Sequence, residues 1–454
     1  MKFLILLTLI AAPAWGFRRG HISELPGHIR SSFDTPDHGP LLGTDFVFAI
    51  PNSHLSSTDQ SYTETLTLTI TNPGTTDGSI TVYSSDPDFV NVTVAITKQS
   101  SSTVNITPPT LQTNYMDLGN GKTVYDRKAL FVASNTPVSL VVSNFRTDAK
   151  GGDTFAVIPT CNLAQQYFMI GDQSIPNQFK ANYTNIITLV GAKQNATVKL
   201  GGLLASSIEI GPGDTVTIAT NLYVNSVIIN STAPIAVFSA NVCGYSHVNP
   251  QACSYEAAML FPTRSWGAFV PFYKLLPEDT GEVIVRFQYD KTYLLIDNEV
   301  YHTKPFYSDE YVALNITSGV YLQGSSPIDV TAIGNIANSG LGAPFFLHVP
   351  SSNNFITRDL TFATGLDKSP MTTHVVRITT DINYIGSFSV DGYAPNPLLY
   401  RRMGFSDYYF VDVKVTAGQH TISNPKLQPY SAVVYGYGPD QSYAFAPGVY
   451  LLRK

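Results

Sequence analysis

Charged residues are scarce in this sequence, since Asp, Glu, Lys and Arg make up 13% of its 454 residues, about half the usual share. The net charge is −6, and no block of like charge occurs along the chain. A protein that binds nucleic acid would show a basic patch, so the composition argues against that class. Ser, Thr, Asn and Tyr take the place of charge, together with 33 Gly and 29 Pro. This mixture favours strands and turns over helices.

Long apolar runs are also missing, because none approaches the roughly 20 residues that cross a bilayer. The N-terminus has a shorter one: Lys2 is followed by the apolar stretch 3–12 and by a small-x-small cleavage site at 14–16. We therefore expect residues 1–16 to be a signal peptide. Residues 17–39 are polar and broken by proline and glycine, which indicates a flexible leader. The mature protein is expected to be soluble, secreted and extracellular, without a membrane span.

Three cysteines are too few for a scaffold built on disulfides. Cys243 and Cys253 bracket a turn-rich loop, and we expect them to form a disulfide that stabilises the fold by about 3 kcal/mol on the chain-entropy model. Cys161 is then left unpaired. An odd cysteine in a secreted protein is either a buried thiol or a link between two chains. Burial is the simpler interpretation, and an oligomer linked through Cys161 is the alternative.

Glycosylation is expected at sequons of the form N-x-S/T, which in a secreted eukaryotic protein accept N-linked glycans and must face solvent. Pro108 directly follows the second sequon and disfavours its use. The six sequons begin at Asn91, Asn105, Asn182, Asn195, Asn230 and Asn315.

Sequence motifs of enzymes are absent: there is no GxSxG, no HExxH, no CxxC and no glycine-rich phosphate loop. We expect no catalytic residue, cofactor or metal, although the members of a catalytic triad need not be close in sequence. The acidic groups 86–88, 297–299 and 309–310 each offer fewer oxygens than the six to eight that calcium takes, so we interpret them as solvated loop charge. His247, inside the cysteine loop, is interpreted as a turn residue.

Two series of short strands recur along the chain. Strands that follow a proline begin at Pro137, Pro234, Pro327 and, more loosely, Pro429, at intervals of 97, 93 and 102 residues. Strands that end in a proline do so at Pro51, Pro159, Pro262 and Pro350, at intervals of 108, 103 and 88 residues. Two motifs with similar spacing indicate four repeats of roughly a hundred residues, the size of a small antiparallel sandwich.

The expected fold is therefore all-β, with tandem antiparallel β-sandwich-like repeats; paired propeller blades are the alternative. The repeats are placed at residues 40–148, 149–253, 254–338 and 339–454. The last repeat is rich in tyrosine, which we expect to serve mainly for packing in half-buried strands. These tyrosines are Tyr393, Tyr400, Tyr408, Tyr409, Tyr430, Tyr435, Tyr437 and Tyr443.

The chain resembles the IgG Fc-binding protein N-terminal domain family. The resemblance rests on GTDFVFAIPN at 43–52, DTFAVIPTCNLAQQYFMIG at 153–171, the cysteine loop with LFPTRSWGAFVPFY after it, and VYGYGPDQSYAFAPG at 434–448. It implies an extracellular, mostly β module over residues 40–454, found in proteins of mucus and of surfaces. The family also contains members with cysteine-rich partner domains, which this sequence does not have.

The expected function is that of a non-enzymatic extracellular binding or adhesion glycoprotein. Its partners would be glycoproteins, mucus or cuticle components or microbial surfaces, recognised by loops at the ends of the sandwiches. One alternative is a structural component of an extracellular layer, linked through Cys161. Another is a secreted hydrolase on a β-scaffold, which requires an acid, a base and a nucleophile in one cleft.

Overall fold

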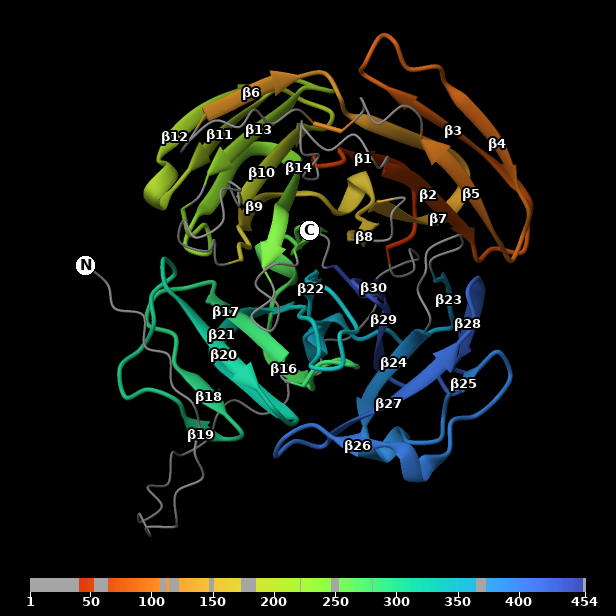
Figure 1. The fold of residues 1–454 in the computed structure, drawn as a ribbon, viewed down its shortest axis with the longest axis vertical. Coiled ribbons are helices and arrows are strands. Elements are labelled where there is room, and N and C mark those ends of the chain that lie inside the picture. Colours follow the sequence, from red (N-terminus) through yellow and green to blue (C-terminus); the bar gives the residue numbers. More distant parts are fainter. Residues whose placement is uncertain are drawn as a thin grey trace. The chain divides into compact units, whose positions relative to one another are not determined.

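The predicted all-β class is confirmed by the computed structural model of the chain (Figure 1). The part of the chain that it describes forms strands β1 to β30 and six short 3-10 turns, with no α-helix. The predicted signal peptide and leader lie outside this part. The described residues are 41–52, 64–106, 112–113, 122–146, 151–172, 185–220, 222–245, 253–279, 281–364 and 373–451.

The strands fall into four successive groups along the chain, which we call units I to IV. We propose that these units are the four repeats expected from the sequence. Unit I (43–157) contains β1 (Gly43–Phe48), β2 (Glu64–Asn72), β3 (Gly78–Ser84), β4 (Val92–Ile96), β5 (Ser100–Ile106), β6 (Lys122–Asp126), β7 (Leu130–Arg146) and β8 (Gly152–Val157). Unit II (164–259) contains β9 (Ala164–Phe168), β10 (Asn185–Gly191), β11 (Ala196–Leu200), β12 (Ser206–Ile210), β13 (Thr215–Thr220), β14 (Ile228–Tyr245) and β15 (Cys253–Met259).

Units III and IV are the next two groups of strands along the chain. Unit III (267–348) contains β16 (Gly267–Phe272), β17 (Gly281–Phe287), β18 (Leu294–Ile296), β19 (Glu299–Val300), β20 (Tyr311–Ile316), β21 (Val320–Ile333) and β22 (Phe346–His348). Unit IV (360–448) contains β23 (Leu360–Ala363), β24 (Thr373–Asp381), β25 (Ser389–Val390), β26 (Arg401–Arg402), β27 (Tyr408–Val415), β28 (Gln419–Ser423), β29 (Tyr430–Gly438) and β30 (Gln441–Gly448).

Units I to III are each built around one long strand that belongs to two antiparallel sheets. In unit I, residues 130–134 of β7 pair with β1 and β3, and β4 continues that sheet. Residues 139–146 of the same strand pair with β2 and β8, and β5 continues the second sheet. The strand β14 does the same in unit II and β21 in unit III. The units are thus sandwich-like, with two curled sheets that share one strand.

The prolines of the first series mark the place where the long strand passes from one sheet to the other. Pro137, Pro234 and Pro327 lie inside β7, β14 and β21, where the ladders to β1, β9 and β16 show register shifts. The expectation that these prolines begin strands was therefore wrong for three of them, because proline also suits a bulge, where no ladder hydrogen bond is required. In unit IV the long strand is broken into β28 and β29, and Pro429 does precede a strand.

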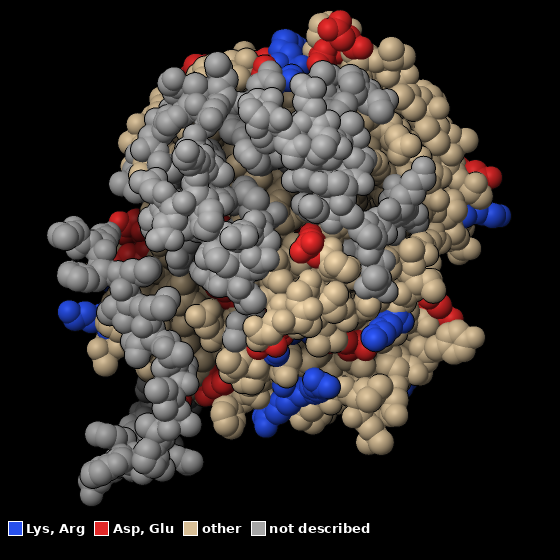
Figure 2. Space-filling model, in the orientation of Figure 1, with Lys and Arg blue, Asp and Glu red and all other residues tan. Residues whose placement is uncertain are grey.

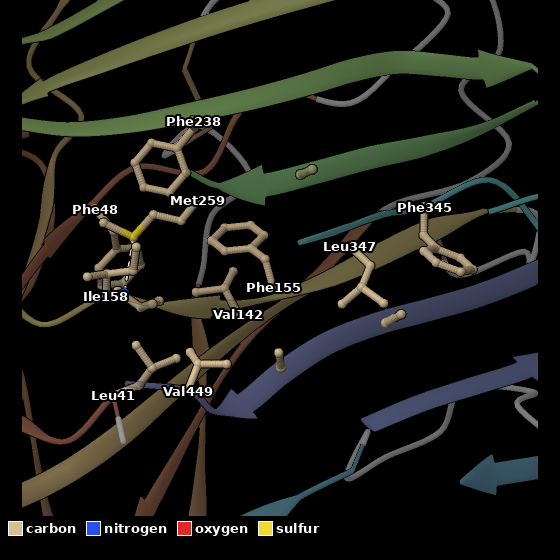
Figure 3. Packing of buried hydrophobic residues seen from close by; sticks show 14 of the residues in the cluster. Leu41, Phe48, Val142, Phe155, Ile158, Phe238, Met259, Phe345, Leu347 and Val449 are labelled. Carbon is tan, nitrogen blue, oxygen red and sulfur yellow. Dashed lines mark hydrogen bonds between the residues drawn. The ribbon is translucent and has the colours of Figure 1, made fainter. Parts of the chain in front are cut away.

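The last strands of the four units meet in one core. β8 packs against β15 and β30, and β22 packs against the same two strands. Figure 3 shows Phe155 and Ile158 from β8 and its end beside Phe238, Met259 and Leu347. Phe155 and Phe238 meet edge to face with ring centroids 5.7 Å apart. Each such fully buried side chain contributes about 1.5–3 kcal/mol, so the units stabilise one another.

The second proline series needs one correction. Pro159, Pro262 and Pro350 follow the core strands β8, β15 and β22, and a 3-10 turn comes next in each case: η2 (Thr160–Asn162), η4 (Thr263–Ser265) and η5 (Ser352–Asn354). Pro51 instead follows β1, the first strand of unit I. The remaining 3-10 turns are η3 (Gly202–Leu204), η6 (Ile382–Tyr384) and η7 (Pro397–Leu399).

Candidate binding surface

A hairpin of unit III holds a turn of unit IV. Its two turn residues, Asp297 and Asn298, have φ angles of +52° and +68°, as in a type I′ hairpin turn. Asp297 Oδ1 accepts the amide of Phe405 at 2.9 Å and the amide of Tyr321 at 3.0 Å. Asn298 Nδ2 donates to the carbonyl of Phe405 at 3.0 Å. Both polar groups of the Phe405 backbone are therefore fixed, while its side chain stays 69% exposed.

Gly404 is required for this contact. Its φ is +56°, and a Cβ at this position would lie 1.9 Å from Asp297 Oδ1 and 2.6 Å from the amide nitrogen of Tyr321. No side chain fits at such distances without moving the hairpin away. We call Asp297, Asn298, Gly404 and Phe405 the interunit clamp.

Large apolar side chains are exposed mainly on units III and IV. Among the described residues, seven are exposed on unit III and six on unit IV, against four on units I and II together. Those of units III and IV are Phe269, Leu276, Tyr289, Tyr293, Val300, Tyr301, Tyr307, Ile382, Tyr393, Leu398, Leu399, Phe405 and Leu427. Aromatic and apolar side chains in solvent are the groups from which protein interfaces are built.

The exposed tyrosines of unit III stand on a packed base. Phe306 stacks on the fully buried Phe287 with centroids 4.6 Å apart, and Tyr301 lies 6.5 Å from Phe306. The backbones of Thr292 and Phe306 exchange hydrogen bonds of 3.0 and 2.8 Å. The stacked rings of Phe287 and Phe306 thus lie beneath the exposed tyrosines. This surface is therefore ordered in the absence of a partner.

Unit IV presents its apolar residues on η7. Asn396 caps this turn by accepting the amide of Leu398 at 3.0 Å. Leu398 and Leu399 are 89% and 60% exposed, whereas the following Tyr400 is buried. Arg401 comes next, in the edge strand β26, and is exposed. This part of the surface therefore combines apolar contact area with positive charge. On the face that Figure 2 shows, the described charged side chains are few and mixed in sign.

The tyrosines of the last repeat serve mainly for packing, as predicted. Tyr430, Tyr435 and Tyr443 are at most 1% exposed, and Tyr443 also hydrogen-bonds His374 Nδ1 at 2.8 Å. Tyr393 is the exception, since it is 82% exposed.

The predicted disulfide stays a prediction. Cys253 pairs with Tyr245 across β14 and β15, and Cys243 lies two residues before Tyr245. The side chains of both cysteines and residues 246–252, including His247, lie outside the described part of the chain. Cys161 is in η2 and exposed, with its thiol 3.2 Å from Asn162 Oδ1. The expectation of a buried thiol was wrong, because η2 directs residue 161 outward.

Five of the six predicted sequons lie on described residues, and their asparagines are all exposed: Asn91, Asn105, Asn195, Asn230 and Asn315. Asn182 lies outside the described residues. Exposure is the condition for glycosylation, and occupancy remains a prediction.

The acidic groups that we interpreted as loop charge have local structural roles. Asp86 accepts the amide of Asp88 at 3.0 Å, and Glu310 accepts the amide of Tyr307 at 3.0 Å. Asp297 belongs to the interunit clamp, a role that the sequence did not suggest. Within the described residues, no three His, Cys, Asp or Glu side chains come together in the way that metal ligands do.

Two buried histidines, His348 and His420, have a carboxylate partner, as a catalytic base would. His348 Nδ1 is 3.0 Å from Asp329 Oδ1, and Arg286 hydrogen-bonds the other oxygen of Asp329. However, His348 Nε2 accepts the backbone amide of Phe261 at 3.2 Å, and the Phe261 ring stacks on the imidazole at 4.4 Å. The nitrogen that would activate a nucleophile is thus occupied by the main chain, and the cluster serves to pair buried charge. Although burial opposes it, Arg286 and His348 hold the pKa of Asp329 well below its usual range. In the second pair His420 Nδ1 is 2.6 Å from Asp391 Oδ2, and Nε2 lies 2.9 Å from the carbonyl oxygen of Thr416.

Two further carboxyl groups are buried and have no ion-pair partner among the described residues. Asp153, in β8, accepts the amides of Thr154 and Ala257 at 2.7 and 3.0 Å. Glu256, in β15, has no hydrogen-bond partner for either oxygen among the described residues. Burial raises the pKa of both groups well above the usual range, and for Glu256 neighbouring carboxyls, Asp172 first, add to the effect. Burial therefore favours the uncharged form of both carboxyl groups.

These features define a class: an all-β protein of sandwich-like units whose distinctive surface consists of exposed apolar loops. Residues 153–436 match the family described as IgGFc binding protein, and the chain belongs to this family. Members of the family are extracellular binding proteins. The match is narrower than expected, since the motif at 43–52 precedes it and most of 434–448 follows it.

A search of curated proteins finds no match to this chain. In the described part of the chain, no helix has the length and apolar character that a membrane crossing requires.

Proposed function

We propose that the protein is a secreted, non-enzymatic binding or adhesion glycoprotein, which recognises extracellular glycoproteins, mucus or cuticle components or microbial surfaces through the loops of units III and IV. The observation that carries the proposal is the exposed Phe405 of the interunit clamp, together with the other exposed apolar side chains of units III and IV. Phe405 is 69% exposed although its backbone is hydrogen-bonded on both sides. A side chain that is ordered before binding loses little entropy when a partner binds. The fixed position of Phe405 therefore supports a role in recognition more than its exposure alone would.

Arg401 and the exposed tyrosines fit the same function. Tyrosine and arginine are enriched where proteins bind one another, because each offers both contact area and hydrogen bonds. The family name refers to the Fc part of immunoglobulin G, so Fc is one ligand to test beside surface glycoproteins.

The test is capture by the purified protein of components of an extracellular surface extract, with and without enzymatic deglycosylation of the extract, and of an Fc fragment in a parallel experiment. The variant Phe405→Ser with Leu398→Ser removes two exposed apolar groups from unit IV. Val90→Ser with Tyr125→Ser is the matched control, since these residues are 80% and 62% exposed in unit I. We expect the first variant to lose about tenfold or more in affinity and the control to bind as the wild type does. Equal binding by both variants would place the ligand elsewhere.

The second candidate is a structural component of an extracellular layer linked through Cys161, which the exposure of this residue favours. Electrophoresis without and with a reducing agent separates the two functions, because a dimer linked through Cys161 would become a monomer on reduction.

A further inference from the structure

The four units differ in how they protect one particular edge of a sheet. This edge is formed by the fifth strand of each unit: β5, β13, β20 and β27. In each unit the fifth strand lies on the opposite side of the sheet from the last strand, which belongs to the shared core. β6 covers β13 from residue 215 to residue 219, and β26 covers β27 at Tyr409 and Phe410. In the described part of the chain, β5 pairs only with β2, and β20 pairs only with β17.

The open edges of β5 and β20 lack the features by which edge strands usually avoid pairing with other chains. They are 7 and 6 residues long and contain no proline, lysine or other charged residue: SSSTVNI in β5 and YVALNI in β20. Their inward side chains, such as Val104 and Leu314, are buried, so the strands are firmly seated in their sheets. A regular edge of this kind presents free amides and carbonyls to any other strand.

Both open strands carry a sequon at the same position. Asn105 and Asn315 are exposed, and each precedes the last inward residue of its strand, Ile106 or Ile316. Neither β13 nor β27 contains a sequon. Asn230, by contrast, lies in β14 between two paired strands, β9 and β11.

We propose that N-linked glycans on Asn105 and Asn315 cap the open edges of units I and III and so prevent the pairing of this chain with other strands. In units II and IV a strand of the protein itself covers the equivalent edge, and no glycan is needed there. A glycan is bulky and hydrated, so its attachment beside the outer ladder positions blocks the approach of a second backbone. The inference rests on secretion, which belongs to the proposed function, but not on any ligand.

The experiment uses the full chain secreted from eukaryotic cells. Peptide mass spectrometry after enzymatic deglycosylation, which converts an occupied Asn to Asp, gives the occupancy of each sequon. We expect Asn315 to be fully occupied and Asn105 to a lower degree, because Pro108 follows its sequon. Absence of a glycan from both positions would overturn the proposal.

The second measurement is the monomer fraction by size-exclusion chromatography after prolonged incubation. Asn105→Gln with Asn315→Gln is expected to lower this fraction by about threefold, whereas the control Asn195→Gln with Asn230→Gln leaves it unchanged. Asn105→Lys with Asn315→Lys lacks the same glycans but carries an edge charge, and is expected to remain monomeric. A Gln variant as monomeric as its control would refute the capping role.

If the Gln variant is not secreted, enzymatic deglycosylation of the folded wild-type protein gives the same comparison, and a stable monomer there would refute the proposal. Capture of a ligand does not enter either measurement, so the proposed function and the edge-capping role can fail separately.

Discussion

Units I and II differ from units III and IV both in their interior charge and in their surface, although all four are built around a long strand or its two halves. Units I and II bury the carboxyls Asp153 and Glu256 without an ion-pair partner among the described residues, whereas unit III pairs Asp329 with Arg286, and unit IV pairs Asp412 with Arg377 at 2.8 Å. Units III and IV also expose most of the apolar side chains. The difference shows that the same framework accommodates buried carboxyls with and without an arginine partner, and surfaces with few or many exposed apolar side chains.

The largest effect is expected from breaking the buried pair of unit III. Arg286→Met removes the arginine partner of Asp329 and leaves the buried carboxylate with only His348 and Thr331, so it should lower the free energy of unfolding by about 3–5 kcal/mol at pH 7. Denaturant unfolding measures this. Arg286→Met combined with Asp329→Leu should recover most of the loss, and a single variant within about 0.5 kcal/mol of the wild type would contradict the role of the pair.

A smaller effect is expected at the interunit clamp. Asp297→Ala removes the acceptor of two backbone amides, including that of Phe405, and should cost about 1–3 kcal/mol of stability. Because Phe405 then loses its fixed position, capture of the ligand should weaken by about tenfold. Asp297→Asn keeps an acceptor oxygen and serves as the control. Unchanged capture of the ligand by Asp297→Ala would show that binding does not depend on the clamp.

The unpaired carboxyl of unit II predicts a dependence on pH. The raised pKa of Glu256 means that its contribution to stability is fully present below its ordinary pKa, 4.5, and is lost as pH rises towards the folded-state pKa. Glu256→Gln lacks this loss, so its free energy of unfolding should decline less than that of the wild type above about pH 5, by about 1.4 kcal/mol for each unit of pKa shift. Parallel pH profiles for the two proteins would contradict a neutral Glu256.

Glu278 sharpens the same comparison, because it lies in unit III but is buried like the carboxyls of units I and II. Burial raises its pKa to about 8, against the ordinary value of 4.5. Its contribution to stability is therefore lost between about pH 4.5 and 8, and Glu278→Gln should flatten the pH profile in this range. The pH profiles of Glu256→Gln and Glu278→Gln, measured together, show how fully units I and II differ from units III and IV in the behaviour of their buried carboxyls.

The smallest effect is expected from Cys161→Ser. Residue 161 is exposed in the 3-10 turn η2, so stability should change by less than about 0.5 kcal/mol. Capture should equal that of the wild type. A variant that runs as a monomer where the wild type is a disulfide-linked dimer would favour the structural-layer function.

The all-β class and the repetition were predictable because they depend on local signals. Short apolar runs with turn residues between them predict strands, and the prolines at 137, 234 and 327 repeat because each marks the same point of a long strand. The exposure of the sequon asparagines followed from the chemistry of glycosylation.

The arrangement of the strands was not predictable, because pairing partners lie far apart in the sequence. Nothing in residues 122–126 indicates that β6 joins the sheet of unit II at residues 215–219. The clamp was missed for a related reason. In the sequence Asp297 and Asn298 were interpreted as loop charge, and only the structure shows that the turn at Gly404, over a hundred residues later, contacts them. Glu256 was missed because a carboxyl in a strand is ordinarily on the solvent side.

The shared core also determines when the chain can fold. Strand β8 rests on β30, and the turns η2 and η5 contact the last described residues: Asn162 Nδ2 donates to the carbonyl of Leu451 at 3.2 Å, and Asn354 Nδ2 donates to that of Tyr450 at 2.9 Å. At synthesis rates of about 5–20 residues per second, β8 emerges roughly 15–60 s before these partners exist. During that interval β8 can pack against β15, which ends at Met259, but not against β30. The core that the four units share can therefore be completed only after the last unit has been synthesised.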